Sequence, residues 1–415
     1  MITLTVCAAV AIVAWALVGE RLRSWHISGA VAMVLVGIVA GFFLQTELEA
    51  GLNMVIAERV AEVILALLLF VDAIEVRGGL LGGERSRVLR LLLIALPVSL
   101  ILAVVVGLPL LGTSVFAVIV MACVVLPLDF APAPELLRDR TLPRGMRHAL
   151  AVESGYNDGL FSPLFACALL AVALPSAGEH ETPFGALEGA FPALGCALLF
   201  GVGIGGVVGL LVRWVVARRW APENGVRLAM VLVPLITYAG AVAVGGNGFV
   251  AAFVAGLTYR FARAGSGRTQ SDIPERELSL VDDIATLSSF FMWFVFGAMV
   301  SLVFVTPVEW GAIGFAVLAL TLFRIVPVYL AFLGSSVSFR ERTALGFAAP
   351  RGTSSVVFGL LAFNALHEDD ANIALYVLLV TVLGSIVMHG LCGVKIVRSL
   401  VADTNSNKLD SVAQK

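Results

Sequence analysis

The sequence predicts an all-α, polytopic membrane protein. Hydrophobic residues make up 60% of the 415 residues and charged residues only 13%, and the mean hydropathy is +1.00. This composition does not fit the surface of a soluble protein. The apolar residues gather into runs long enough to cross a bilayer, and the basic residues between these runs follow a regular alternation. Two of the runs are interrupted by proline or glycine.

A helix needs about 20 apolar residues to cross a hydrocarbon core of about 30 Å. The first apolar run has Arg21 and Arg23 after it and no basic residue before it, which is the reverse of a secretory signal, so we count it as a spanning helix. We expect one transmembrane domain, residues 1–399, and a short polar cytoplasmic tail, residues 400–415. The predicted helices, numbered 1 to 13, are 2–18, 28–44, 59–76, 89–111, 115–137, 147–174, 187–216, 227–244, 247–262, 280–303, 309–333, 343–366 and 371–399.

The charges in the loops give the orientation, because cytoplasmic loops carry an excess of Lys and Arg. Loops after odd-numbered helices, and the C-terminal tail, hold nearly all of the 27 basic residues, whereas loops after even-numbered helices hold mainly acids. The exceptions are Arg59, which falls on the other side, and Arg324 and Arg351, which fall inside helices. The alternation predicts thirteen spans with the N-terminus outside and the C-terminus in the cytoplasm.

Two of the predicted helices are interrupted. Helix 5 contains Pro127, Pro132 and Pro134, and helix 12 contains Ala-Pro-Arg-Gly-Thr-Ser-Ser at residues 349–355. The numbers five and twelve differ by an odd number, so these helices run in opposite directions, as an inverted repeat of helices 1–6 onto helices 8–13 requires. Prolines and glycines are also common in ordinary membrane helices. We favour the interpretation that the paired breaks mark a repeat.

Several polar groups are predicted to share one depth in the membrane. At a rise of about 1.5 Å per residue, Asp158 lies about 16 Å and Ser154 about 10 Å from the cytoplasmic start of helix 6. Asp129 lies about 12 Å from the cytoplasmic end of helix 5 by the same rise. Charged groups at this depth are costly and usually face a partner or a water-filled cavity. A layer about 6 to 14 Å from the cytoplasmic side also holds Asp72, Arg324 and Arg351.

These residues predict a site for a monovalent cation. Ser154 and Asp158 are four residues apart on helix 6, so a hydroxyl and a carboxylate lie on the same face. Hard cations take oxygen ligands, and an interrupted helix offers free backbone carbonyls. We therefore expect Asp129 to contribute a carboxylate and Leu128 its carbonyl. A carboxylate that binds either a proton or a cation allows one to be exchanged for the other, and no nucleotide is required.

The pattern resembles a known family. Pro-Leu-Asp at 127–129, Glu-Ser-x-x-Asn-Asp-Gly at 153–159 and Pro-Arg-Gly at 350–352 are similar to motifs of the monovalent cation/proton antiporter superfamily. The closer resemblance is to its sodium/proton exchanger branch, with Asn-Asp on the sixth helix. It implies a homodimer in the plasma or inner membrane and electroneutral exchange of sodium or lithium for protons. Each protomer would have a core bundle around helices 3–6 and 10–13, in which helices 5 and 12 cross, and a dimerisation side.

Carried over residue by residue, the resemblance assigns roles in the ion site. Asp158 would carry the cation or the proton, and Ser154 would be a ligand. Asn157 would lie beside them and stabilise the crossed helices, and Asp129 would be the acidic residue of the interrupted fifth helix.

The resemblance also assigns supporting roles. Glu153 would pair with Arg351 of helix 12. Asp72 is a looser match to an acidic neighbour of the site. Arg324 is either a second charged partner inside the bundle or a side chain that snorkels toward the cytoplasm.

The chain departs from its apparent family at helix 5. Where the family usually has Thr-Asp-Pro, this chain has Leu128-Asp129-Phe130, so a hydroxyl is absent and the proline is displaced. The site then binds through the Leu128 carbonyl, or its selectivity differs, or transport is weak. The alternative function is an antiporter fold with altered cargo, such as potassium or an organic ion, or a channel or sensor.

Other classes of function find little support. Ser154 does not lie in a G-x-S-x-G element, and the histidine and glutamate spacing of zinc hydrolases is absent, so we expect neither an enzyme nor a cofactor. No phosphate-binding glycine loop is present, and no basic surface for nucleic acid exists beyond the cytoplasmic loops. The expected partners are membrane lipid, the monovalent cation, the proton and a second copy of the chain.

Overall fold

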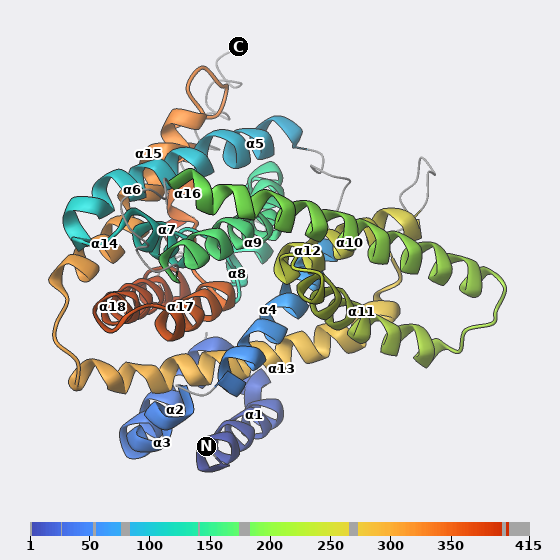
Figure 1. Cartoon of the computed structure of the whole chain (residues 1–415), viewed down its shortest axis with the longest axis horizontal. Helices are drawn as coiled ribbons and strands as arrows, with labels where there is room; N and C mark the ends of the chain where they lie inside the picture. Colours follow the sequence, from blue (N-terminus) through green and yellow to red (C-terminus); the bar gives the residue numbers. More distant parts are fainter. Residues whose placement is uncertain are drawn as a thin grey trace, which may run out of the picture.

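The computed structural model describes residues 2–25, 27–52, 55–75, 84–139, 142–173, 183–264, 273–391 and 396–397. Within these ranges the regular structure is helical and no strand occurs (Figure 1), so the predicted fold class is confirmed. The predicted tail, residues 400–415, lies outside the described residues. The elements are α1 (Ile2–Arg23), α2 (Gly29–Phe43), α3 (Gln45–Leu52), α4 (Val55–Glu75), α5 (Arg85–Arg90), η1 (Leu91–Ala95), α6 (Leu96–Leu111), α7 (Val115–Val125), α8 (Glu135–Arg138), α9 (Arg144–Ala173), α10 (Pro183–Ala217), α11 (Glu223–Ala243), α12 (Gly248–Ala264), α13 (Glu275–Met299), η2 (Val300–Phe304), α14 (Trp310–Leu320), α15 (Leu322–Ala331), α16 (Phe339–Phe347), α17 (Thr353–Ala365), α18 (Glu368–Ser385) and η3 (Ile386–Leu391).

Each of the thirteen predicted ranges overlaps one helix or a run of consecutive helices. The helices α2, α7 and α17 are apolar but short, and the amphipathic α3 was not predicted. The count of thirteen spans and the orientation of the termini stay predictions. Seven helical segments are long and apolar enough to cross a membrane, judged by length and composition: Ile2–Arg23, Arg85–Leu111, Pro192–Ala217, Asn224–Ala243, Glu275–Phe304, Trp310–Ala331 and Asp369–Gly390.

Both predicted interruptions are present. The helix α7 ends at Val125, well before the predicted end at residue 137, because the prolines that follow have no N–H to continue the helical hydrogen bonds. In predicted helix 12, residues 348–352 separate α16 from α17. The two irregular segments lie against each other, and the Asp129 N–H donates to the Pro350 carbonyl at 3.0 Å. Backbone groups that lipid could not satisfy are thereby paired inside the protein.

The structure also contains interruptions that were not predicted, among them one in predicted helix 11 and one in predicted helix 4. Predicted helix 11 is divided at Thr321 into α14 and α15, where the backbone turns to φ −125° and ψ −84°. The Thr321 hydroxyl bonds to the Val317 carbonyl at 2.8 Å. Predicted helix 4 contains the π-helical turn η1 just before Pro97, whose missing N–H disturbs the regular α-helical ladder. The division at Thr321 leaves the Ala319 carbonyl outside the α-helical ladder and available to another donor.

The helices form two packed groups (Figure 1). One group contains α6, α7, α9, α14, α17 and α18, and the other contains α2, α4 and α10 to α13. The helices α4 and α13, which correspond to predicted helices 3 and 10, pack most extensively on α12 and α2 and also contact α17. Glycines allow the closest approaches, because a Cβ at Gly37 or Gly205 would overlap backbone atoms of α13 or α12. The surface between the groups is where the polar residues of α4, α9, α13 and α17 meet.

Candidate ion-binding site

The Asp158 carboxylate lies at a polar cavity of about 300 Å³. Asp158 is 4% exposed, and its Oδ1 has no hydrogen-bond partner among the described residues. The helix α9 lies close to α12 at this point, since a Cβ at Gly159 would overlap the Phe253 ring. The lining residues with side-chain oxygen atoms are Asp72, Asp129, Asp158, Asp282, Thr286, Ser289, Thr353 and Ser354.

Asp129 lines the same cavity but already has partners for both oxygens. Its Oδ1 accepts from the Ala131 N–H at 2.8 Å, and its Oδ2 accepts from the Thr353 N–H at 2.6 Å. The second bond caps the N-terminus of α17 from another segment, which satisfies a free donor and offsets the positive helix end. A Cβ at Gly352 would overlap the Asp129 carboxylate, so glycine is needed for this approach. This geometry is that of a helix cap, and a role of Asp129 as a cation ligand stays a prediction.

Ser154 and Leu128 lie together. The Ser154 hydroxyl donates to the Leu128 carbonyl at 3.0 Å, as the broken segment passes beside α9. The contact brings together two of the predicted ligands, although neither residue lines the cavity that holds Asp158. The Leu128 side chain is fully buried, so only the backbone of this residue is presented to polar groups.

Glu153 pairs with Arg324, and the predicted pair with Arg351 is wrong. The Arg324 Nη1 and Nη2 atoms lie 2.5 and 2.8 Å from the two Glu153 carboxylate oxygens. Glu153 is 0% exposed and Arg324 is 5% exposed, so both charges are removed from solvent. Arg324 is therefore a charged partner inside the bundle, and it does not snorkel. Two parallel hydrogen bonds of this kind fix geometry as well as charge.

Arg351 instead bonds to backbone carbonyls. Its Nε donates to the Val125 carbonyl, its Nη1 to the Ala349 carbonyl at 2.6 Å and its Nη2 to the Ala319 carbonyl at 3.1 Å. The carbonyls come from the end of α7, the segment before α17 and the end of α14, which is divided from α15 at Thr321. A cation at the negative ends of helices is favourable. One guanidinium thus ties three interruptions together.

Asn157 lies apart from the Asp158 cavity. It lines a small space with Glu153, Arg324 and Arg351, and its Oδ1 has no hydrogen-bond partner in the described part of the chain. The helical period explains this position, since Asn157 follows Glu153 by four residues and so shares its face. The structure therefore separates Asn157, predicted as a neighbour within the site, from the carboxylate beside it in sequence.

The cavity contains oxygen atoms that the sequence did not point to. Asp282 lines the cavity with Asp72, as do Thr286 and Ser289. Both carboxylates already have an interaction partner. The helical period could have indicated this polar face, because residues 282, 286 and 289 lie at i, i+4 and i+7 on one face of α13. Ser354 at the start of α17 was also missed.

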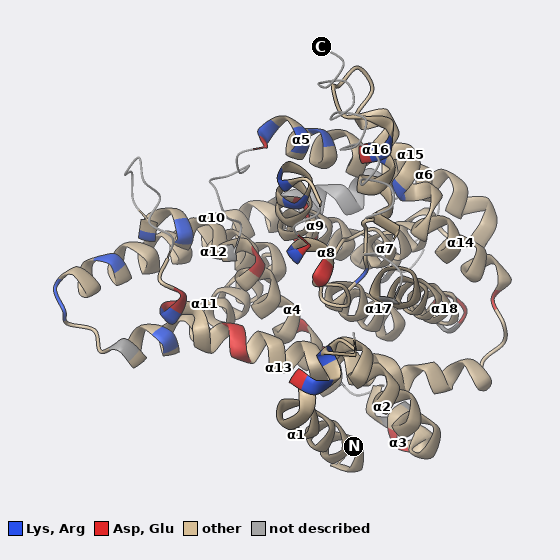
Figure 2. Ribbon diagram, turned by 180° about the vertical axis from the view of Figure 1, so that it is seen from behind, with Lys and Arg blue, Asp and Glu red and all other residues tan. Residues whose placement is uncertain are grey.

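A second cavity of about 370 Å³ adjoins the first. Both are lined by Ala131, Ser289 and Phe290, and the second extends to Arg23 and Arg138. Figure 2 shows basic residues on α5 and near the start of α9, the side that the loop charges predict to be cytoplasmic. The two cavities form an approach to Asp158 from that side, and we refer to them together as the vestibule.

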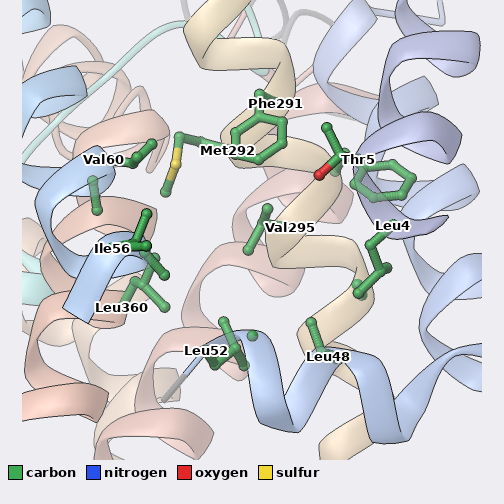
Figure 3. A pocket seen from close by; sticks show the side chains of 15 residues that line it. Leu4, Thr5, Leu48, Leu52, Ile56, Val60, Phe291, Met292, Val295 and Leu360 are labelled. Atoms are coloured by element: carbon green, nitrogen blue, oxygen red, sulfur yellow. The ribbon is translucent and has the colours of Figure 1, made fainter. Parts of the chain in front are cut away.

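A third pocket has a different character. It has a volume of about 220 Å³ and lies between α1, α3, α4 and α13 (Figure 3). Its lining is apolar apart from Thr5, with side chains such as Ile56, Val60 and Met292 pointing into it. Its lining contains no carboxylate.

Comparisons with known proteins identify the family and support the fold. The sequence model of the family described as sodium/hydrogen exchanger, transmembrane, matches residues 8–398. A structure of the sodium proton antiporter MjNhaP1 from Methanocaldococcus jannaschii at pH 8 superimposes with a TM-score of 0.69 at 20% identity, over 94% of this chain and 99% of that chain. An electron-microscopy map of the same antiporter gives a TM-score of 0.70 at 19% identity, over 97% and 98% of the two chains.

Proposed function

The chain belongs to the sodium/hydrogen exchanger family, and we propose that it is a secondary active antiporter that exchanges a monovalent cation for protons by alternating access. We propose sodium or lithium as the cation, because the cavity at Asp158 is lined by carboxylate and hydroxyl oxygen atoms, which hard monovalent cations bind. The similarity to a solved sodium proton antiporter over nearly the whole of both chains supports the fold that this mechanism needs.

One observation carries the proposal: the Asp158 carboxylate is buried, without a hydrogen-bond partner for Oδ1 in the described chain, and faces a cavity. A buried charge without compensation is very unfavourable. The carboxyl group therefore either takes up a proton or binds a cation. Competition between the two at one side chain couples the uptake of one to the release of the other.

The surrounding carboxylates support an electroneutral exchange. Both oxygens of Asp129 accept backbone N–H groups, and Glu153 is held by Arg324. Asp72 and Asp282 also have partners. We propose that Asp158 is the carboxylate that exchanges its ligand, and one carboxylate carries one charge. We propose that one monovalent cation is exchanged for one proton.

The vestibule provides the route on one side. It extends from Arg23 and Arg138 to Asp158, so an ion approaching from the predicted cytoplasm meets the carboxylate through it. The carboxylate lies on α9 between the two helix groups. We propose that a movement of one group against the other exposes Asp158 to the opposite side, while Arg351 and Asp129 hold the interrupted helices together.

A second candidate function follows from the departure at helix 5. Leu128 is fully buried and contributes only its carbonyl, which already accepts from Ser154. A site with one hydroxyl fewer favours altered cargo, such as potassium or an organic ion, or a role as a channel or sensor. Transport measured with several cations distinguishes these functions.

The exposed apolar side chains bear on the assembly and location of the protein. The helices α1 and α10 expose large apolar side chains, for example Leu17 at 80% and Leu199 at 78%. In a membrane such side chains contact lipid or a second copy of the chain. We propose a homodimer in the plasma or inner membrane, with the N-terminus outside and the C-terminus in the cytoplasm.

The test is transport in proteoliposomes. Purified protein is reconstituted with an internal pH-sensitive dye, and sodium, lithium or potassium is added outside at several pH values. We expect sodium or lithium to drive proton movement and Asp158→Asn to abolish it while the variant still elutes as folded protein. Absence of exchange with all three cations would refute the proposed function. Exchange retained by Asp158→Asn would refute the assignment of Asp158 as the carrier.

A further inference from the structure

Ser354 is a buried hydroxyl beside the proposed carrier that has no partner of its own. It is 3% exposed, and its Oγ has no hydrogen-bond partner among the residues that the structure describes. Ser354 and Asp158 line the same cavity. A buried hydroxyl without a partner is unfavourable, so this pair of groups is suited to a ligand between them.

The two other hydroxyls of the cavity lining that are at least partly buried, those of Ser289 and Thr353, are already engaged. The Ser289 and Thr353 hydroxyls bond to each other at 2.7 Å. The Ser154 hydroxyl donates to the Leu128 carbonyl. Ser354 is thus the buried hydroxyl lining the described cavity that is available to a ligand.

The beginning of α17 would at first sight repel a cation. A helix N-terminus has a partial positive charge from its free N–H groups. Here the Asp129 carboxylate accepts from the Thr353 N–H at 2.6 Å and places a negative charge at that helix end. Because this carboxylate offsets the positive charge of the helix end, the Ser354 oxygen lies in a region where a cation can bind.

We infer that Ser354 is a ligand of the transported cation and provides the hydroxyl that helix 5 lacks at Leu128. This inference rests on the proposed function and names one further residue of the same site. The neutral hydroxyl oxygen adds to the Asp158 carboxylate when a cation is bound. It is not needed for the proton, which binds to the carboxylate itself. Loss of the hydroxyl should therefore weaken cation binding more than it slows turnover.

The test compares matched variants in proteoliposomes. Ser354→Ala should raise the KM for sodium or lithium by about fivefold to tenfold with little change in kcat, as expected for the loss of one neutral oxygen ligand. Ser354→Thr keeps the hydroxyl, so its KM should stay close to that of the wild type. Valine has about the volume of threonine but no hydroxyl, so Ser354→Val should raise the KM as Ser354→Ala does. This Thr and Val pair decides the case if alanine impairs folding.

Ser355→Ala is the control on the neighbouring residue. Ser355 is also fully buried and its Oγ also has no hydrogen-bond partner in the described chain, but it does not line the cavity. We expect its KM to stay unchanged. If Ser354→Val and Ser354→Thr share the wild-type KM, the inference is overturned and the proposed function stands. If the wild type itself exchanges no cation, the proposed function fails and the inference fails with it.

Discussion

The pair of Glu153 and Arg324 gives a sharp prediction about stability. In Arg324→Gln, the Glu153 carboxylate loses both hydrogen bonds, of 2.5 and 2.8 Å, at a position that is 0% exposed. Removing one partner of a buried ion pair leaves an uncompensated charge, so the variant should lose about 3 to 5 kcal/mol of unfolding free energy. Equilibrium unfolding in detergent micelles by added denaturant measures the loss.

A double-mutant cycle isolates the pair. The double variant Glu153→Gln with Arg324→Gln leaves no buried charge without a partner. Most of the lost unfolding free energy should therefore be recovered, and a large coupling free energy should appear. The same cycle with Glu153 and Arg351 should give a much smaller coupling, because Arg351 bonds to backbone carbonyls. A coupling between Glu153 and Arg351 as large as that with Arg324 would refute the reasoning.

Two further predictions concern the scaffold. Asp129→Ala removes the cap of α17 and should cost about 1 to 2 kcal/mol, with faster amide hydrogen exchange in the first turn of that helix; unchanged exchange would contradict the cap. Gly205→Leu should destabilise the protein by about 1 to 3 kcal/mol, because a Cβ there overlaps the Ala255 carbonyl of α12. Gly203→Leu is the matched control, since a Cβ there meets no neighbour within 4 Å; equal melting temperatures for the two variants would contradict the packing.

Much of the fold could be predicted because membrane helices have strong local signals. Apolar runs set the helices, and prolines after Val125 predicted the interruption that the structure contains. The division at Thr321 had no such signal, since its neighbours are apolar and no proline lies beside it. It arises from packing, and the Ala319 carbonyl that it frees bonds to Arg351.

The site could be predicted only in part. The depth of Asp158 followed from its place in the sequence, but depth alone did not decide between Arg324 and Arg351 as the partner of Glu153, because both lie in the same layer. The separate position of Asn157 could have been read from the helical period, which groups it with Glu153. The role of Asp129 as a cap depends on the approach of two distant segments, and no local pattern shows that.

The central claim is that one carboxylate binds either a cation or a proton. The most direct measurement is proton release when sodium or lithium is added to the purified protein in weakly buffered detergent solution. The account predicts about one proton released per cation bound where the empty site is protonated, with an apparent affinity that falls by up to about tenfold per unit decrease in pH. Asp158→Asn should release none. Cation binding without proton release, or equal release from Asp158→Asn, would contradict the account.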